Sequence, residues 1–184
     1  MTTLADRKVR VFVEALASRA PAPGGGSAAA LTSALGAALL GMVGRIVLAR
    51  PGALASRRRV RQACVVCDRE RRALLRLMDE DARAYTQLIK VWRRGPSPAR
   101  RAAQRRAIEA PLTICERTMA VLRQASCIQS VAGHRLVSDV AAGAALLTGG
   151  FAAAAATVAA NLDGLDQPAQ AEAIRRKLRT LTRR

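Results

Sequence analysis

The amino-acid sequence predicts an all-α protein. Alanine, leucine and arginine dominate the 184 residues, whereas aromatic residues make up only 2%. No segment shows the dense run of valine, isoleucine and threonine, alternating every two residues, that is typical of a strand. We therefore expect one multihelical bundle domain over residues 1–184, built from about six helices.

Capping residues and helix breakers mark the first two helices. Thr3 and Asp6 can cap a first helix. Its expected apolar face consists of Val9, Phe12, Val13 and Leu16. Ser27 is the natural N-cap of a second helix that runs to about Ala49, before the break at Pro51.

A long third helix is expected from about Ser56 to Trp92. Its apolar stripe is Val60, Cys64, Cys67, Leu74, Met78, Tyr85, Leu88 and Trp92. Arg71 and Asp81 occupy two positions where the helical spacing calls for an apolar residue.

Three further helices complete the expected bundle. Ser97 and Pro98 open the fourth, which Pro111 should bend. Ser138 should cap a fifth, rich in alanine and glycine, that runs to about Leu162. A short basic helix follows, and its inward side chains are Ile174, Leu178 and Leu181.

The charge is strongly positive. Thirty-one basic residues against thirteen acidic ones leave a net charge of +18, which favours anionic partners such as nucleic acid, acidic membranes or polyanionic small molecules. A basic belt from Arg45 to Arg106 holds much of this excess. The belt is either an ordinary solvated surface or a polyanion-binding face. The scarcity of aromatic residues gives single-stranded nucleic acid little support.

The cysteines and the N-terminus point to a reducing compartment. Cys64 and Cys67 form a C-x-x-C inside a helical pattern, and no second close pair completes a zinc site. We therefore expect reduced packing residues and no metal. The sequence MTTLADRKVR has no apolar secretory core, which favours the cytoplasm.

Two uncharged segments, 21–44 and 140–162, are long enough to span a bilayer. Their apolar character comes mainly from alanine and glycine, so membrane insertion is weakly favoured. Small residues instead allow helices to approach closely inside a core. Because no apolar partner in the chain is large enough to cover both, we expect a soluble homodimer with these helices at its centre.

The glycine-rich segment "PGGGS", residues 23–27, lacks the Lys-Ser/Thr of a Walker loop. Its glycines let a ligand approach the backbone, and the helix that follows presents free N–H groups to a carboxylate or an oxyanion. The alternative is a flexible linker before a capped helix.

Several acidic and polar residues are candidates for chemistry. Asp81 interrupts an apolar stripe, which is costly for a carboxylate unless it is paired or used, and Tyr85 lies on the same face. Alternatively Asp81 pairs with an arginine such as Arg71 of a dimer mate. Asp139 is either a functional acid or an ordinary helix-stabilising one. His134 is either a proton donor or a loop hydrogen-bonder.

The stretches "PAPGGGSAAALTSALGAALLGMV", "DEDARAY" and "SDVAAGAALL…TVAANL", in that order, resemble the cyclodeaminase/methenyltetrahydrofolate cyclohydrolase family. The glycine-rich motif of the family falls on Pro23, Gly24, Gly25, Gly26 and Ser27. Its acidic motif falls on Asp81, Ala84 and Tyr85, and its Ser-Asp pair on Ser138 and Asp139. Thr157 and His134 stand where the family usually has asparagine, whereas Asn161 is kept.

The resemblance implies an all-α intertwined homodimer that acts on a tetrahydrofolate derivative. We expect hydrolysis of 5,10-methenyltetrahydrofolate to 10-formyltetrahydrofolate. Formiminotetrahydrofolate cyclodeaminase activity and a non-catalytic polyanion binder are the alternatives. Asp139 and then Asp81 are the expected acid–base groups, with Tyr85 orienting them. Ser138, Asn161, His134 and the glycine-rich segment are expected to bind the substrate, and basic residues its glutamate tail.

Overall fold

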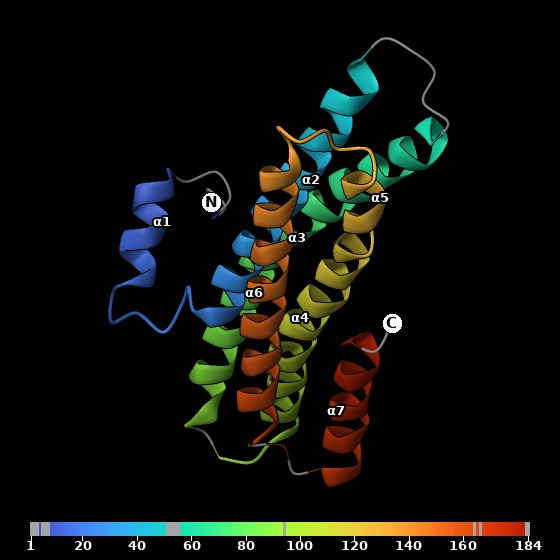
Figure 1. Cartoon of the computed structure of the whole chain (residues 1–184). Helices are drawn as coiled ribbons and strands as arrows, with labels where there is room; N and C mark the ends of the chain where they lie inside the picture. The colour runs from blue at the N-terminus through green and yellow to red at the C-terminus, as the bar shows by residue number, and fades with distance from the viewer. Residues whose placement is uncertain are drawn as a thin grey trace.

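The computed structural model describes residues 4, 8–50, 56–93, 95–163, 165 and 167–182, and within them it contains seven helices (Figure 1). They are α1 Val9–Leu16, α2 Gly25–Ala49, α3 Arg57–Trp92, α4 Pro98–Leu122, α5 Ala125–Gln129, α6 Val137–Leu162 and α7 Pro168–Thr182. The described residues contain no strand, so the expected all-α fold is confirmed.

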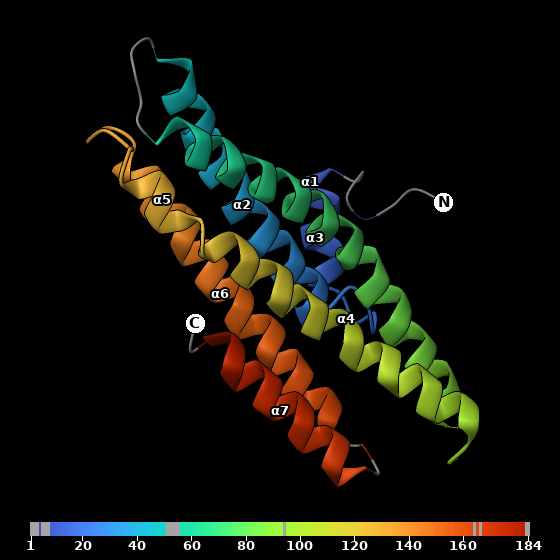
Figure 2. The same ribbon diagram turned by 90° about the vertical axis from the view of Figure 1, so that its right-hand side faces the viewer.

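Four long helices form the bundle. Helix α2 packs against α3 and α6, and α4 packs against α3 and α6. Figure 2 shows α7 beside α6 and α4, and Figure 1 places α1 to the side of the bundle. The largest fully buried side chains are Leu40, Leu74, Met78, Ile114, Ile128 and Leu147.

Helices α2 and α6 run antiparallel and approach closely through small residues. A Cβ atom added at Gly36 would lie 2.7 Å from the carbonyl oxygen of Gly143. One added at Gly150 would overlap the hydroxyl of Ser33 and lie 3.1 Å from its backbone nitrogen. The alanine- and glycine-rich composition of both helices is therefore a packing requirement of their contact.

Two expected helix caps are wrong, whereas a third is confirmed. Helix α2 begins at Gly25 with Gly24 as its N-cap, because the hydroxyl of Ser27 is bonded to α3 instead. Helix α6 begins after Leu136, and Ser138 makes no capping bond. The hydroxyl of Ser97 does accept a hydrogen bond from the backbone N–H of Arg100.

Helix α1 is less buried than its sequence pattern predicts. Only Phe12 of its apolar face is buried, whereas Val9 is 74% and Val13 54% exposed. The expected capping residues Thr3 and Asp6 lie outside the described residues, as does the break at Pro51. Helix α5 was not expected, because five residues are too few to show a helical period.

The two irregular positions of the α3 stripe have different partners. Nη2 of Arg71 lies 3.7 Å from Oδ1 of Asp68 on the same helix. Arg71 therefore pairs with Asp68 and not with Asp81 of its own chain. A buried carboxylate that the stripe did not reveal, Glu70, is paired with Arg69 and with Arg117 of α4. At the end of the stripe Trp92 is 40% exposed and stacks on the guanidinium of Arg100.

All four cysteines are free thiols, as expected, and three of them are buried. Burial raises the pKa of Cys67 and of Cys115 to about 12, and it also raises the pKa of Cys64. Helices α2 and α6 are long and apolar enough to cross a membrane by length and composition alone. Core helices of soluble proteins pass the same test. Half of the apolar window of α2 is buried, whereas 28% of that of α6 is buried, and the two helices pack against each other.

Candidate active site

The structure brings the glycine-rich segment and Asp81 together. A Cβ atom added at Gly26 would overlap the carboxyl group of Asp81, lying 2.5 Å from its Cγ. The hydroxyl of Ser27 lies 3.0 Å from Oδ2 of Asp81 and 2.9 Å from the carbonyl oxygen of Met78. Only glycine fits at position 26, because the carboxyl group occupies the space that a side chain would need.

Asp81 is a buried carboxyl group with 7% of its surface exposed. Burial raises the pKa of Asp81 above its ordinary value, while hydrogen bonding from the hydroxyl and backbone of Ser27 acts in the opposite direction. Within the described residues no basic side chain forms an ion pair with it. An acid held in this way is suited to proton transfer.

The start of α2 can receive an anionic or carbonyl oxygen. The first backbone hydrogen bond from this turn runs from the N–H of Ala28 to the carbonyl of Gly24, so the amides of residues 25–27 precede the helical ladder. Gly25 is exposed, and a Cβ atom there would lie 3.2 Å from the hydroxyl of Thr157 on α6. The positive end of the helix dipole adds to the attraction.

Asn161 has a partner inside the protein. Its Nδ2 donates a 2.7 Å hydrogen bond to the carbonyl oxygen of Ala107 on α4. Pro111, four residues later on α4, has no N–H to serve that carbonyl. The side-chain amide of Asn161 thus links the end of α6, one turn beyond Thr157, to the backbone in the middle of α4.

Tyr85 follows Asp81 by one turn of α3 and is 36% exposed. It makes no side-chain hydrogen bond to another described residue. The phenol is therefore available to a ligand at this end of α2, on the same side of α3 as Asp81.

The remaining predicted residues lie at the opposite end of α6. Asp139 is in the first helical turn, and Ser138 and His134 are exposed nearby. Eighteen residues separate Asp139 from Thr157, which corresponds to about 27 Å along the helix. Within one chain the structure does not bring Asp139 to Asp81.

A groove of about 1070 Å³ runs along the outside of α3 and α4 beside Pro23, the residue before the glycines. Three basic side chains line it, which are Arg83, Lys90 and Arg106. Acidic side chains at Asp79, Glu80 and Glu109 also line it. Sequence reasoning anticipated basic residues near the site but not which ones, because their position depends on how α3 and α4 pair.

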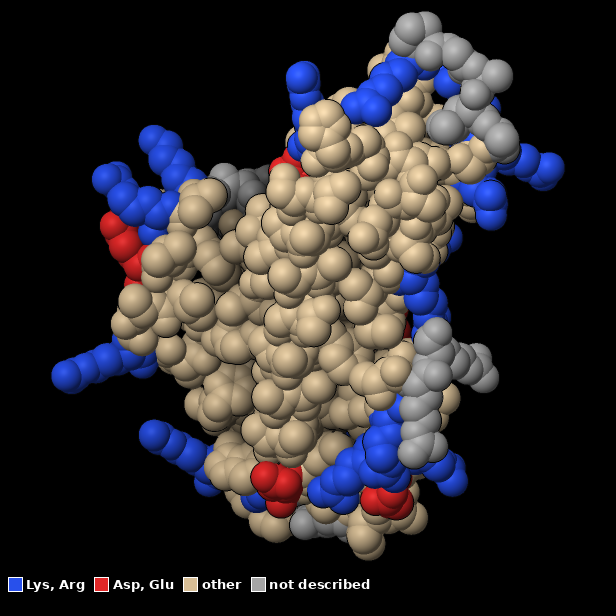
Figure 3. Space-filling model, in the orientation of Figure 1, with Lys and Arg blue, Asp and Glu red and all other residues tan. Residues whose placement is uncertain are grey.

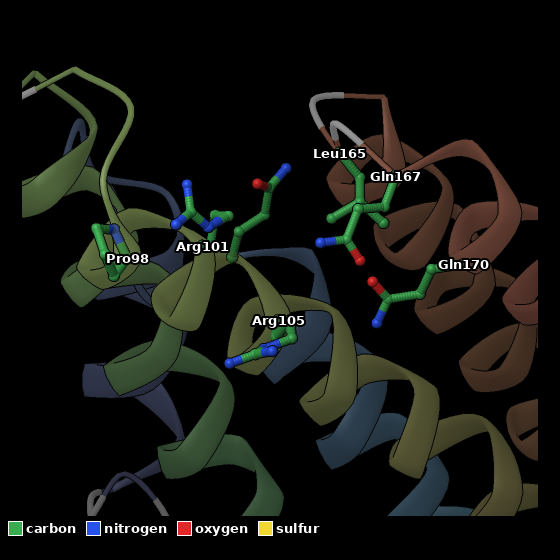
Figure 4. A pocket seen from close by; sticks show the side chains of 7 residues that line it. Pro98, Arg101, Arg105, Leu165, Gln167 and Gln170 are labelled. Carbon is green, nitrogen blue, oxygen red and sulfur yellow. The ribbon is translucent and has the colours of Figure 1, made fainter.

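A smaller pocket of about 150 Å³ lies between the start of α4 and the α6–α7 connection (Figure 4). Its lining includes Arg101, Arg105, Gln167 and Gln170. None of the predicted site residues lines it. Among the described residues, no group of three or more histidine, cysteine, aspartate or glutamate side chains is arranged to hold a metal ion.

The sequence pattern of the formiminotransferase-cyclodeaminase family matches residues 8–180 of this chain. The chain belongs to that family. Methenyltetrahydrofolate cyclohydrolase of Methylorubrum extorquens is 30% identical over 178 residues, which cover 91% of this chain and 85% of the relative. The family resemblance expected from the motifs is thus confirmed.

A second relative is larger, and a solved structure with the same fold is more distant in sequence. Formimidoyltransferase-cyclodeaminase of Sus scrofa is 32% identical over 97% of this chain, which spans 35% of that protein. The crystal structure of formiminotetrahydrofolate cyclodeaminase from Thermotoga maritima superposes with a TM-score of 0.90. The match covers 96% of this chain and 88% of that one at 19% identity, and it shows a shared fold.

Proposed function

We propose that this family member is a folate one-carbon enzyme that hydrolyses 5,10-methenyltetrahydrofolate to 10-formyltetrahydrofolate. The observation that carries the proposal is the junction of Gly26, Ser27 and Asp81, which sets a buried carboxyl group against the free amides of a helix start. The 30% identity to a methenyltetrahydrofolate cyclohydrolase along most of both chains supports this choice of reaction.

The start of α2 supplies the oxygen-binding part of the site. Water attacks the cationic methenyl carbon, and the oxygen that becomes the formyl group gains negative charge as the adduct collapses. The amides of Gly25 and Gly26 can donate hydrogen bonds to that oxygen, whereas the amide of Ser27 is directed at Asp81. Thr157 and the exposed Tyr85 can orient the ring from α6 and α3.

The working unit in this proposal is a homodimer that buries α6. The face of α6 turned away from the bundle is uncharged, and Figure 3 shows a continuous surface without charged residues there, with basic and acidic side chains at its edges. The exposed residues of α6 between 141 and 160 are Ala141, Ala142, Ala145, Thr148, Gly149, Ala152, Ala153, Ala156, Ala159 and Ala160. A second copy of the same smooth face fits it, because small side chains let two helices approach closely.

A symmetric dimer on this face brings Asp139 to the site of the other copy. Gly149 lies at the middle of the exposed face, and a Cβ atom there would have no neighbour within 4 Å. If two α6 helices cross antiparallel at Gly149, the partner's Asp139, ten residues before it, faces Ala159, ten residues after it. Thr157, at almost the same level as Ala159, follows Asp139 by five whole turns and so lies on the same side of α6. A Cβ atom added at Gly25 would lie 3.2 Å from the hydroxyl of Thr157.

The two carboxyl groups then have separate roles. The partner's Asp139 stabilises the amidinium cation of the substrate, and Asp81 moves the proton of the attacking water. His134 and Ser138 accompany the partner's Asp139 and would contact the substrate from the same side. Asn161 supports the site by holding the end of α6, and its Oδ1 remains available to the substrate.

The groove beside Pro23 is the proposed place for the glutamate tail of folate. Arg83, Lys90 and Arg106 line it beside three acidic side chains and can pair with the carboxylates of the tail. The net charge of +18 raises the local concentration of a polyanionic substrate. This assignment gives the basic belt a role in folate binding. The free thiols of all four cysteines suit a cytoplasmic location for such an enzyme.

A product assay tests the reaction. Purified protein should accelerate the loss of methenyltetrahydrofolate absorbance and yield 10-formyltetrahydrofolate, while releasing no ammonia from 5-formiminotetrahydrofolate. Ammonia release without hydrolysis would assign the chain to the cyclodeaminase reaction. The absence of both reactions, together with selective nucleic-acid binding at sub-micromolar concentration, would assign it to polyanion binding.

A further inference from the structure

The hydroxyl of Ser27 has two hydrogen-bond neighbours inside the protein. Its Oγ lies 3.0 Å from Oδ2 of Asp81 and 2.9 Å from the carbonyl oxygen of Met78. Ser27 is fully buried and Asp81 is 7% exposed. Since a hydroxyl carries one proton, Ser27 can donate to only one of these oxygens at a time.

Each protonation state of Asp81 matches one orientation of that hydroxyl. When Asp81 is ionised, Ser27 donates to its carboxylate. When Asp81 is neutral, its own O–H can donate to Oγ of Ser27, which turns to donate to the carbonyl of Met78. Both arrangements leave every buried polar hydrogen with an acceptor, so neither state carries the cost of an unsatisfied donor.

The surroundings of Asp81 leave Ser27 as its main polar partner. From α2 it meets the backbone of Gly26 and the start of the helix. On its own helix the nearest titratable neighbour on that side is Tyr85, one turn away, and α6 contributes the uncharged Thr157 next to Gly25. No ion pair to Asp81 occurs among the described side chains.

We propose that Ser27 is a positioning residue whose turning hydroxyl allows Asp81 to take up and return a proton during turnover. The inference rests on the proposed hydrolase function and assigns Ser27 a role other than the substrate contact expected from its motif. The carbonyl of Met78 is a suitable second acceptor, because it belongs to the middle of α3 and keeps its helical bond from Ala82 in both states.

The proton balance of the reaction requires such a group. As water forms the new C–O bond, one of its protons passes to ionised Asp81, and the cationic substrate becomes a neutral adduct. When the bond between carbon and N5 breaks, Asp81 returns its proton to N5 while the hydroxyl proton of the adduct leaves to water. The sum is one water consumed and one proton released per 10-formyltetrahydrofolate formed.

The test compares Ser27→Ala with Ser33→Ala, which removes another fully buried serine from the same helix. Without the hydroxyl of Ser27, ionised Asp81 loses a donor. In Ser27→Ala we therefore expect the acidic limb of the plot of kcat against pH to move to higher pH. We also expect kcat at neutral pH to fall about tenfold or more. KM should change much less. Ser33→Ala should leave the limb in place.

A second readout does not depend on turnover. The second readout is the NMR chemical shift of the carboxyl carbon of Asp81, whose signal is assigned by its disappearance in Asp81→Asn. This signal should titrate at higher pH in Ser27→Ala than in the wild type. Circular dichroism checks folding, and if Ser27→Ala is unfolded, Ser27→Cys, with its weaker donor, should give an intermediate shift. An unchanged titration in the folded Ser27 variant would overturn the proposal. If the titration shifts but the wild-type protein has no hydrolase activity, the link between Ser27 and the protonation of Asp81 holds and the proposed hydrolysis is wrong.

Discussion

Asn161 of α6 donates a 2.7 Å hydrogen bond to the carbonyl oxygen of Ala107, the oxygen that Pro111 leaves without a helical donor. Asn161→Ala should therefore leave a partly buried acceptor unsatisfied and lower the free energy of unfolding by about 1–3 kcal/mol. Urea denaturation measures the loss. In a Pro111→Ala background, residue 111 can donate its N–H to Ala107, so the same substitution should cost less. Equal costs in both backgrounds would contradict this account of the bond.

Position 26 should tolerate only glycine, whereas position 24 should tolerate alanine. A Cβ atom at Gly26 would overlap the carboxyl group of Asp81, but one at Gly24 would meet nothing within 4 Å. We expect Gly26→Ala to displace Asp81 and lower kcat/KM about 100-fold. Gly24→Ala should retain most of the activity. Steady-state kinetics measure kcat/KM of both variants. Equal values would show that Asp81 does not belong to the active site.

Asp81 should make the stability of the protein depend on pH in a defined direction. Because burial raises its pKa in the folded state, the folded protein holds this proton more tightly than the unfolded chain does. The contribution of Asp81 to stability is therefore complete below its ordinary pKa of about 3.9 and is lost as pH rises through the folded value. Relative to Asp81→Asn, the wild type should lose free energy of unfolding as the pH rises above about 4. A constant difference would contradict the raised pKa.

A charge on the exposed face of α6 should separate the proposed dimer. Ala152 is exposed on that face, and Ala152→Arg would place unpaired charges across the symmetry axis. We expect a monomer by light scattering at micromolar concentration. Val65→Arg is the matched control, because Val65 is 54% exposed on α3 and lies away from α6. A dimer that survives Ala152→Arg would exclude this face as the interface.

The sequence pattern predicted the long helices well but not the exact use of their polar residues. Helical spacing and breakers located α3 from Arg57 to Trp92 and α4 from Pro98. The same rules assigned Ser27 to a cap, because local sequence does not show that Asp81, more than fifty residues away, would compete for its hydroxyl. A cap is a local inference, whereas this bond depends on the packing of α2 against α3.

The candidate site was predictable to the same extent. The glycine-rich motif and the polar interruption at Asp81 are visible in the chain, and the structure joins them. The separation of Asp139 from Asp81 was not visible, because it follows from the antiparallel course of α2 and α6. Glu70 was missed for a similar reason, since its partner Arg117 lies on α4.

Mixing two inactive variants shows whether two copies of the chain share one folate hydrolase site. Asp81→Asn and Asp139→Asn should each abolish the accelerated loss of methenyltetrahydrofolate absorbance. When the two chains are co-expressed, half of the dimers combine them, and one of the two sites in each mixed dimer keeps both carboxyl groups. We expect the mixture to recover about a quarter of the wild-type activity. No recovery in a mixture shown to contain mixed dimers would contradict it.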